Sequence, residues 1–176
     1  MASELHVDAI KHSGGTSAIT INSSGSVNIA GNVLQTVFVE TSSQVDVNSS
    51  TYVDTNITAT ITPKFSTSKI LILTNMTIDS ASSNNLQAKL LRGSTQIKLE
   101  QFWGYFQTSS ANSHFKVTRE SHMHIDSPST TSSTTYKLQV GSRSSVEFNL
   151  NRASENFNEV YMIGQTSAIT LYEVTT

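Results

Sequence analysis

The tripeptide His122-Met123-His124 is the strongest candidate for metal chemistry in this sequence. Residues two apart on a β-strand share one face, so both imidazoles would point the same way. If that face met a threefold axis, two imidazoles from each of three chains would suit an octahedral divalent transition metal. A histidine pair without further ligands is weak support for such a site. We favour the alternative, in which Met123 and Ile125 enter the core and the two histidines face solvent. The sequence therefore predicts neither a metal nor another cofactor.

Four aromatic residues lie close together in Phe102-Trp103-Gly104-Tyr105-Phe106. On a strand, Trp103 and Tyr105 would share one face and the two phenylalanines the other. Trp103 and Tyr105 could form a platform that stacks a sugar, or a contact with a host surface. Aromatic side chains dominate protein cores and obligate interfaces, however. We therefore favour an interpretation that buries one face of the cluster in a sandwich and the other between subunits.

Sequence motifs of the common enzyme classes are missing from the chain. No serine lies in the G-x-S-x-G pattern of a nucleophile elbow. Gly14-Gly15-Thr16 lacks the lysine and the spacing of a phosphate-binding loop. Glu155 and Glu159 are expected to lie in a loop, where paired carboxylates are usually solvated. The sequence therefore predicts a protein that is not an enzyme.

The composition describes a weakly charged chain that is rich in hydroxyl groups. Its 176 residues carry a formal net charge of −2, with 14% charged residues, 29 serines, 23 threonines and no cysteine. Such a chain has no dense basic field to neutralise phosphates, which argues against a nucleic-acid binder. Its longest apolar run, Ile70–Leu73, is far too short to span a bilayer. The opening residues show no basic cluster followed by an apolar run, so we expect synthesis in the cytoplasm without a secretory signal.

Apolar residues recur at every second position through most of the chain, which is the pattern of half-buried strands. Clusters of Ser, Asn and Gly between these runs favour turns. Only Leu86–Leu91 has some helical character, and Arg92-Gly93 ends it. We predict about ten short strands and essentially no helix. Alternating pairs include Val37 and Val39, Ile57 and Ala59, Ile70 and Ile72, and Ile169 and Leu171.

The predicted organisation is an N-terminal arm at residues 1–34 followed by a β-sandwich at residues 35–176. The arm is too short to bury a core of its own. Within it, Ile19–Ile29 is predicted to form a strand, a tight turn and a strand. Its apolar residues would share one face: Ile19, Ile21, Val27 and Ile29. An isolated two-stranded ribbon is marginal in water, so we expect three copies to bury these side chains around a common axis. The alternative is a hairpin that lies on its own sandwich.

The segments Leu5–Ile10, Gly15–Ile21 and Ser24–Ile29 resemble the opening of fibre and other virion proteins of tailed bacteriophages, marine phages in particular. In that family, a unit of isoleucine-x-isoleucine, Asp/Asn-Ser-Ser-Gly and valine-x-isoleucine belongs to a trimeric shaft or docking segment. This chain has one such unit, whereas long fibres have many. The resemblance therefore implies a short spike, a compact fibre tip or a capsid decoration.

The C-terminal part is similar to the jelly-roll heads of those virion proteins. The similarity lies in Ile61–Phe65 with Ser68–Ile72, in Asp126–Lys137, and in Ser167–Val174. Together the two resemblances imply an all-β, homotrimeric protein with an N-terminal docking ribbon and a jelly-roll-like antiparallel β-sandwich. Virion proteins are assembled in the bacterial cytoplasm, which agrees with the absence of cysteine.

We therefore expect a non-enzymatic structural protein of the virion surface, a short trimeric fibre or spike that aids host attachment by multivalent binding. Its partners would be two sister chains, other tail or capsid proteins, and a glycan or protein of the host surface. Neither nucleic-acid binding nor membrane insertion is expected. Loops at Ser80–Asn85, Ser109–Ser113 and Ser127–Thr135 would face the host or solvent. Two alternatives remain: a trimeric capsid decoration that stabilises the head, and a monomeric bacterial carbohydrate-binding module.

Overall fold

The computed structural model describes residues 6–23, 25–29, 31–80, 84–104, 116–142, 148–151 and 165–175. Within these ranges the chain forms thirteen β-strands and no helix, so the all-β prediction is confirmed. No helical segment in them has the length and apolar content that crossing a bilayer needs. The strands are β1 (Ala9–Lys11), β2 (Ser17–Ile21), β3 (Val27–Asn28), β4 (Val33–Thr41), β5 (Val45–Val47), β6 (Val53–Ile61), β7 (Lys69–Ser80), β8 (Asn84–Arg92), β9 (Thr95–Gly104), β10 (Lys116–Asp126), β11 (Thr134–Ser142), β12 (Phe148–Leu150) and β13 (Ser167–Val174).

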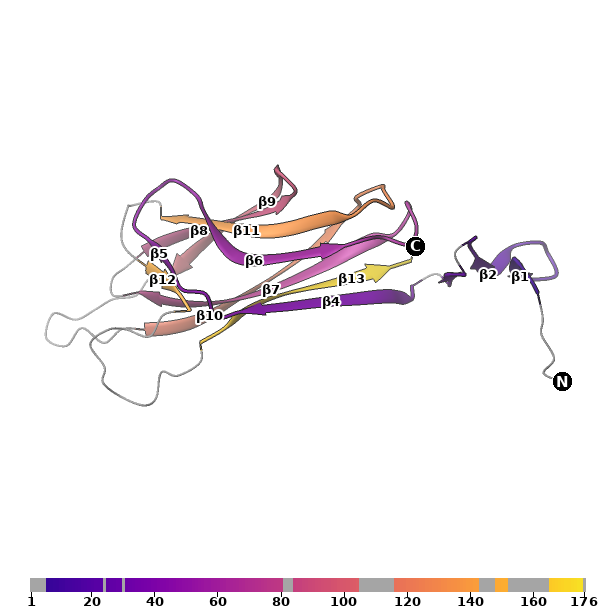
Figure 1. The fold of residues 1–176 in the computed structure, drawn as a ribbon, viewed down its shortest axis with the longest axis horizontal. Coiled ribbons are helices and arrows are strands. Elements are labelled where there is room, and N and C mark those ends of the chain that lie inside the picture. The colour runs from indigo at the N-terminus through magenta and orange to yellow at the C-terminus, as the bar shows by residue number, and fades with distance from the viewer. Residues whose placement is uncertain are drawn as a thin grey trace, which may run out of the picture.

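Two antiparallel sheets face each other as a sandwich (Figure 1). The first sheet has the strand order β4-β13-β7-β10. In the same sheet, β12 pairs with the C-terminal end of β7, and β5 pairs with β12. The second sheet has the order β6-β11-β8-β9. Apart from the β8–β9 hairpin, successive strands from β6 to β11 alternate between the sheets, and β13 returns to pair with β4. The antiparallel β-sandwich predicted from the alternating pattern is therefore present.

Apolar side chains from the inner faces of both sheets form one core. β11 shows the alternation clearly, because Tyr136, Leu138 and Val140 are buried while the residues between them are half-buried. β13 follows the same rule, with Ile169 and Leu171 fully buried. Inner-face residues of two packed sheets interdigitate in this way and exclude water. The largest buried side chains of the other strands are Ile57, Ile61, Ile70, Ile72, Met76, Phe148 and Leu150.

The passage with some helical character, Leu86–Leu91, lies within strand β8. β8 pairs with β11 on one side and β9 on the other. Leu86, Ala88 and Leu90 are buried at alternate positions, as a strand that faces the core requires. Hydrogen bonding to two neighbouring strands thus outweighs the local helix propensity of leucine, alanine and lysine.

A buried carboxylate ties β13 to the connection between β6 and β7. The Glu173 side chain is fully buried, and its Oε1 accepts hydrogen bonds from the backbone amides of Lys64 at 2.6 Å and Phe65 at 3.3 Å. Gln35 Nε2 donates to Oε2 at 2.6 Å. These donors take the place of water, as burial of a charge requires. Two of the segments that resemble jelly-roll heads therefore meet at this point.

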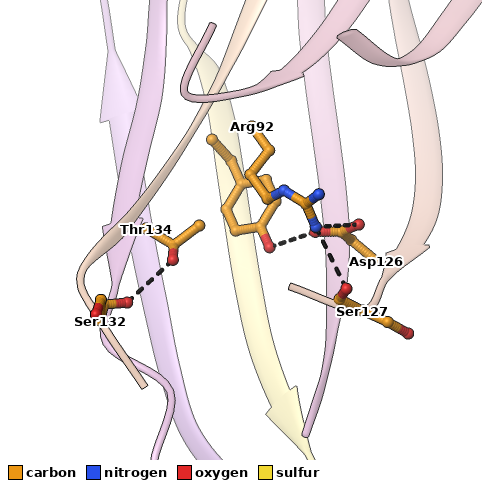
Figure 2. Close-up of polar contacts among 6 residues, drawn as sticks. Arg92, Asp126, Ser127, Ser132 and Thr134 are labelled. Atoms are coloured by element: carbon orange, nitrogen blue, oxygen red, sulfur yellow. Dashed lines mark hydrogen bonds and ion pairs between the residues drawn. The ribbon is translucent and has the colours of Figure 1, made fainter. Parts of the chain in front are cut away.

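A second polar network joins the two sheets through Arg92, Asp126 and Tyr136 (Figure 2). Tyr136 on β11 donates its hydroxyl hydrogen to Asp126 Oδ2 at 2.7 Å. Arg92 on β8 donates from Nη1 to both oxygens of the same carboxylate, at 2.9 and 3.1 Å, and to the backbone oxygen of Ser127 at 3.3 Å. Burial, and after it the hydrogen bond to Asp126, raises the pKa of Tyr136 well above its ordinary value. Tyr136 therefore remains a neutral donor.

The first three strands form a separate small sheet in the order β1-β2-β3. The predicted strand, turn and strand are confirmed, with Ile21 opposite Val27 and a left-handed Gly25 (φ 78°) in the turn. β1 is a third strand that the sequence interpretation did not include, and it places Ile10 opposite Ile19. Figure 1 shows this small sheet beyond the end of the sandwich.

Backbone hydrogen bonds connect the small sheet to the sandwich near the end of β13. Gly31 N donates to Thr175 O at 3.0 Å, and Thr175 N donates to Asn32 O at 3.0 Å. β4 then begins at Val33, just before residue 35, where the sandwich was predicted to start. Among the described residues from 6 to 32, no side chain is buried. Asn22 Nδ2 also donates to Lys64 O at 3.4 Å, so the small sheet is joined to the sandwich by hydrogen bonds and not by a shared core.

Candidate functional site

The outer face of the first sheet carries a continuous band of apolar side chains, which we call the apolar band. Two neighbouring rows of residues, set by the strand registers, make up the band. The first row crosses β4, β13, β7 and β10 through Phe38, Thr170, Leu73 and Met123. The second row crosses them through Thr36, Tyr172, Leu71 and Ile125. Neither row contains a charged residue, so the face presents little that binds water strongly.

Several side chains of the apolar band are strongly exposed. Phe38 and Met123 are each 61% exposed, and Ile125 is 58% exposed. Single exposed apolar residues are common on soluble proteins, but a contiguous patch that crosses four strands marks an interaction surface. The band is therefore the strongest candidate functional site among the described residues.

A hollow of about 370 Å³ interrupts the apolar band between Phe38 and Met123. Its floor is formed by shorter side chains, among them Ala168, Thr170 and Asn75. The taller Phe38 and Met123 stand at its two sides. The face thus combines a protruding aromatic ring with a depression beside it.

The outer face of the second sheet is more polar, although Leu99 on β9 is 44% exposed there. Asp54 on β6 accepts a hydrogen bond from Gln139 Nε2 at 2.9 Å and pairs with Lys137 Nζ at 3.0 Å, both on β11. These hydrogen bonds, that of Gln139 first, lower the pKa of Asp54. Lys89 Nζ lies 3.7 Å from the centre of the Tyr52 ring, a cation–π contact. One face of the sandwich therefore suits water and the other suits an apolar partner.

His122 and His124 lie on the inner face of β10, so the prediction that they face solvent is wrong. Their partners across the ladder are Thr74 and Ile72 of β7, which are both buried. Met123 and Ile125, predicted to enter the core, project outward instead. β10 is an edge strand whose inner positions reach only the margin of the core, where polar side chains are tolerated. Its outer positions extend the leucines of β7 across the band.

The two histidines border a small cavity of about 20 Å³ between the sheets, with room for about one water molecule. Met76 and Leu90 form part of its walls. Thr74 Oγ1 is buried nearby without a hydrogen-bond partner among the described residues. Lys98 Nζ on β9 donates to Met123 O at 3.1 Å and links the sheet edges beside the cavity. The described part of the chain brings together no three His, Asp or Glu side chains that could hold a metal ion.

The apolar band was not predicted from the sequence, although one signal for it was present. Ile70–Leu73 is apolar at four consecutive positions, so both faces of this strand are apolar. Ile70 and Ile72 enter the core, and Leu71 and Leu73 lie in the band. A continuous apolar run in an antiparallel strand therefore predicts apolar side chains on both of its faces.

The four residues predicted to contact sister chains lie in or beside the small sheet. Ile19, Ile21 and Ile29 are half-buried, and Val27 is 41% exposed. Ile10, opposite Ile19, is 49% exposed and adds to the same strip. The small sheet thus carries an apolar strip of its own.

The aromatic cluster is described in part. Trp103 lies in β9, opposite Asn85 of β8. Of the predicted loops, residues 127–133 connect β10 to β11. Outside the described residues lie Tyr105, loop residues 81–83 and 109–113, and the carboxylates Glu155 and Glu159.

No family model matches the chain, and no curated protein matches it. Among solved structures, the chain is similar to dimeric latent PorU from Porphyromonas gingivalis, at 10% sequence identity and a TM-score of 0.38. The match covers 92% of this chain and 15% of that chain.

Proposed function

We propose that this chain is a non-enzymatic structural protein of a phage virion surface, a short trimeric fibre or spike that aids attachment to the host. The apolar band carries this proposal, because an exposed face that includes Phe38, Leu73 and Met123 requires a protein partner in water. The resemblance of both ends of the chain to virion proteins supplies the class of assembly.

The order of the strands supports a jelly-roll head. A sheet ordered β4-β13-β7-β10 that faces a sheet ordered β6-β11-β8-β9 has the connectivity of two Greek keys wound together. Double-sheet jelly rolls of this kind occur in viral capsid and lectin domains. Since one fold serves many functions, this order supports the type of domain, and the function rests on the apolar band.

The small sheet supports a docking role for the N-terminal arm. It extends beyond the sandwich, buries no side chain among its described residues, and carries an apolar strip that includes Ile19 and Ile21 (Figure 1). Three such strips around a threefold axis would bury one another, and threefold symmetry closes the assembly. Other tail or capsid proteins would then contact the same end of the trimer.

The polar outer face of the second sheet is the surface that such a trimer leaves to solvent and host. Asp54 and Lys137 are paired there, and the 127–133 loop lies at one end of β11. Weak contacts made by each of three chains add to a strong attachment, because the second and third contacts form at high effective concentration.

The proposal is tested first by the mass of the purified protein in solution. Size-exclusion chromatography with light scattering is expected to give three times 19.1 kDa. The double variant Phe38→Ser with Met123→Ser should shift this mass toward a single chain. Thr58→Ser, on the polar face, is the matched control and should leave the trimer unchanged. A single-chain mass for the unaltered protein at all concentrations would contradict the proposal and favour a monomeric carbohydrate-binding module.

Immunogold labelling of purified virions tests the location. Label confined to the tail supports a fibre or spike. Label spread over the whole head would replace that role with capsid decoration, and particles without label would contradict both.

A further inference from the structure

We infer that the partner on the apolar band is a second copy of this chain, docked so that the β10 edge of one copy meets the β4 edge of the next. This inference rests on the proposed trimer. It adds the direction in which the sandwiches pack and one charge pair that fixes that direction.

Opposite charges at the two edges of the apolar band are the first argument. Glu40 is exposed on β4, and Arg119 is exposed on β10. Glu40 shares the outer face with Phe38 two residues away, and Thr166 Oγ1 donates to its Oε1 at 2.8 Å. Arg119 lies opposite Thr77 and shares the outer face with Met123. A copy that offers its β10 edge to a neighbouring β4 edge therefore brings a guanidinium to a carboxylate.

The shape of the band is the second argument. Phe38 stands 61% exposed beside a hollow of about 370 Å³ whose far side is Met123. The same face thus offers both a protruding ring and a depression that can receive one. The inference requires the outer faces of the three sheets to turn toward the common axis, so that Phe38 of one copy enters the hollow of the next. Complementary packing of this kind is typical of subunit interfaces.

The chemistry of the band favours protein over sugar. A glycan-binding groove needs several convergent polar groups to hold the hydroxyls of a sugar. Here the two rows consist mainly of aliphatic and aromatic side chains, with Thr36 and Thr170 on the outer strands β4 and β13. The charges lie outside the rows, at the rim, where they direct association and orientation.

Packing of one edge against a different edge is heterologous, and such contacts either close into a ring or continue as a filament. Three copies related by a threefold axis close the ring, and each then uses its β4 edge once and its β10 edge once. A twofold dimer would use the same two edges reciprocally between two chains. These two arrangements differ in how many chains a covalent link would join.

Engineered cysteines can report this arrangement because the chain contains none of its own. β13 and β7 separate β4 from β10 within one sheet, so Glu40 and Arg119 of the same chain are three strand spacings apart, about 14 Å. A disulfide requires Cα atoms within about 7 Å of each other. Cysteines at these two positions can therefore join different chains but cannot close within one chain.

The double variant Glu40→Cys with Arg119→Cys is expected to form a covalent trimer under mild oxidation, visible on a non-reducing gel. Each single variant should remain uncrosslinked, and the two single variants expressed together should give covalent dimers. A matched control, Thr58→Cys with Arg119→Cys, places one thiol on the polar face and should give no covalent species. Covalent dimers alone from the first double variant, or no covalent product, would overturn the inference.

Charge reversal provides an independent measurement. Glu40→Arg alone and Arg119→Glu alone should each weaken trimer association several-fold, and the two together should restore it. Circular dichroism confirms that each exposed-site variant remains folded. If the unaltered protein is a monomer, the proposed function fails. If it is a trimer that neither the cysteines nor the reversals affect, the proposed function stands and this inference fails.

Discussion

Tyr136 donates its hydroxyl hydrogen to Asp126 Oδ2 across 2.7 Å, and Arg92 Nη1 approaches the same oxygen at 2.9 Å. Tyr136 is fully buried, and Asp126 is 9% exposed. The three residues come from β11, β10 and β8, so one carboxylate links strands of both sheets. A buried carboxylate that loses one donor is left partly unsatisfied, and this makes the network sensitive to single changes.

Replacing Tyr136 by phenylalanine should lower the free energy of unfolding by about 1–2 kcal/mol, since the ring still fills the core while Asp126 loses a donor. Urea denaturation followed by circular dichroism measures this loss. Tyr52→Phe is the control, because Tyr52 is half-buried and its hydroxyl bonds to Gln87 near the surface. A loss in Tyr52→Phe as large as that in Tyr136→Phe would contradict the role assigned to the network.

The same tyrosine should limit stability at high pH. Burial and the Asp126 hydrogen bond raise the folded-state pKa of Tyr136 above the ordinary value of 10.0. The contribution of Tyr136 to the free energy of unfolding is therefore complete below pH 10.0 and declines as the pH rises above it. In that range the tyrosine ionises readily in the unfolded chain but not in the folded one. Melting temperatures measured from about pH 8 to about pH 11 should fall less steeply in Tyr136→Phe. Parallel curves for the two proteins would contradict this expectation.

Asp54 should titrate below its ordinary value of 3.8, because Gln139 and then Lys137 stabilise its charged form. Its contribution to stability is present above the ordinary pKa and is lost as the pH falls through the folded-state pKa. NMR titration of the carboxyl carbon should show the midpoint rising in Gln139→Ala and also in Lys137→Met. The pair is exposed, so both changes should have little effect on stability at neutral pH. An unchanged midpoint in Gln139→Ala would exclude that side chain as the main cause.

Glu173→Gln should lower the free energy of unfolding by about 3 kcal/mol. One carboxylate oxygen, an acceptor, is replaced by an amide NH₂ group, which is itself a donor and would face the donors that now bind the carboxylate. Glu173 accepts from two backbone amides and from Gln35 Nε2, with no solvent to compensate. Denaturant midpoints give the measurement. Asp8→Asn is the matched control on an exposed carboxylate outside the apolar band and should change stability by less than about 0.5 kcal/mol. Similar midpoints in the two variants would show that Glu173 does not hold the β6–β7 connection.

Asn151 combines a left-handed backbone (φ 56°) with hydrogen bonds from its Nδ2 to the backbone oxygens of Thr41 and Ser43, each at 3.1 Å. Asn151→Gly and Asn151→Ala both lose these bonds, but glycine tolerates the conformation. Asn151→Ala should therefore be less stable than Asn151→Gly by about 1 kcal/mol in thermal or denaturant unfolding. The reverse order would show that backbone conformation is not what selects asparagine at this position.

The sequence was sufficient to predict the all-β class and the ribbon, because both depend on local alternation. Val37 and Val39, or Ile169 and Leu171, are apolar at every second position, and this spacing holds wherever the strand lies in the sheet. The turn at Gly25 joins strands only a few residues apart, so its pairing is also a local property.

The orientation of β10 could not be predicted in the same way. Alternation separates Met123 from His122, but it does not say which of the two faces the core. Pairing with β7 decides that, since Met123 lies opposite Leu73 on the outer face. The networks around Glu173 and Asp126 likewise join residues distant in sequence, and nothing in their local context distinguishes them from solvated carboxylates.

The position of β13 between β4 and β7 has a consequence for how the chain acquires its structure during translation. Thr41 and Ser167 face each other across the ladder although well over a hundred residues separate them in sequence. The β8–β9 hairpin can close as soon as it leaves the ribosome, whereas β4 must wait for β13 with its apolar side unprotected. A nascent chain arrested before Ser167 should therefore be captured by chaperones, and release of β13 from the exit tunnel should end that capture.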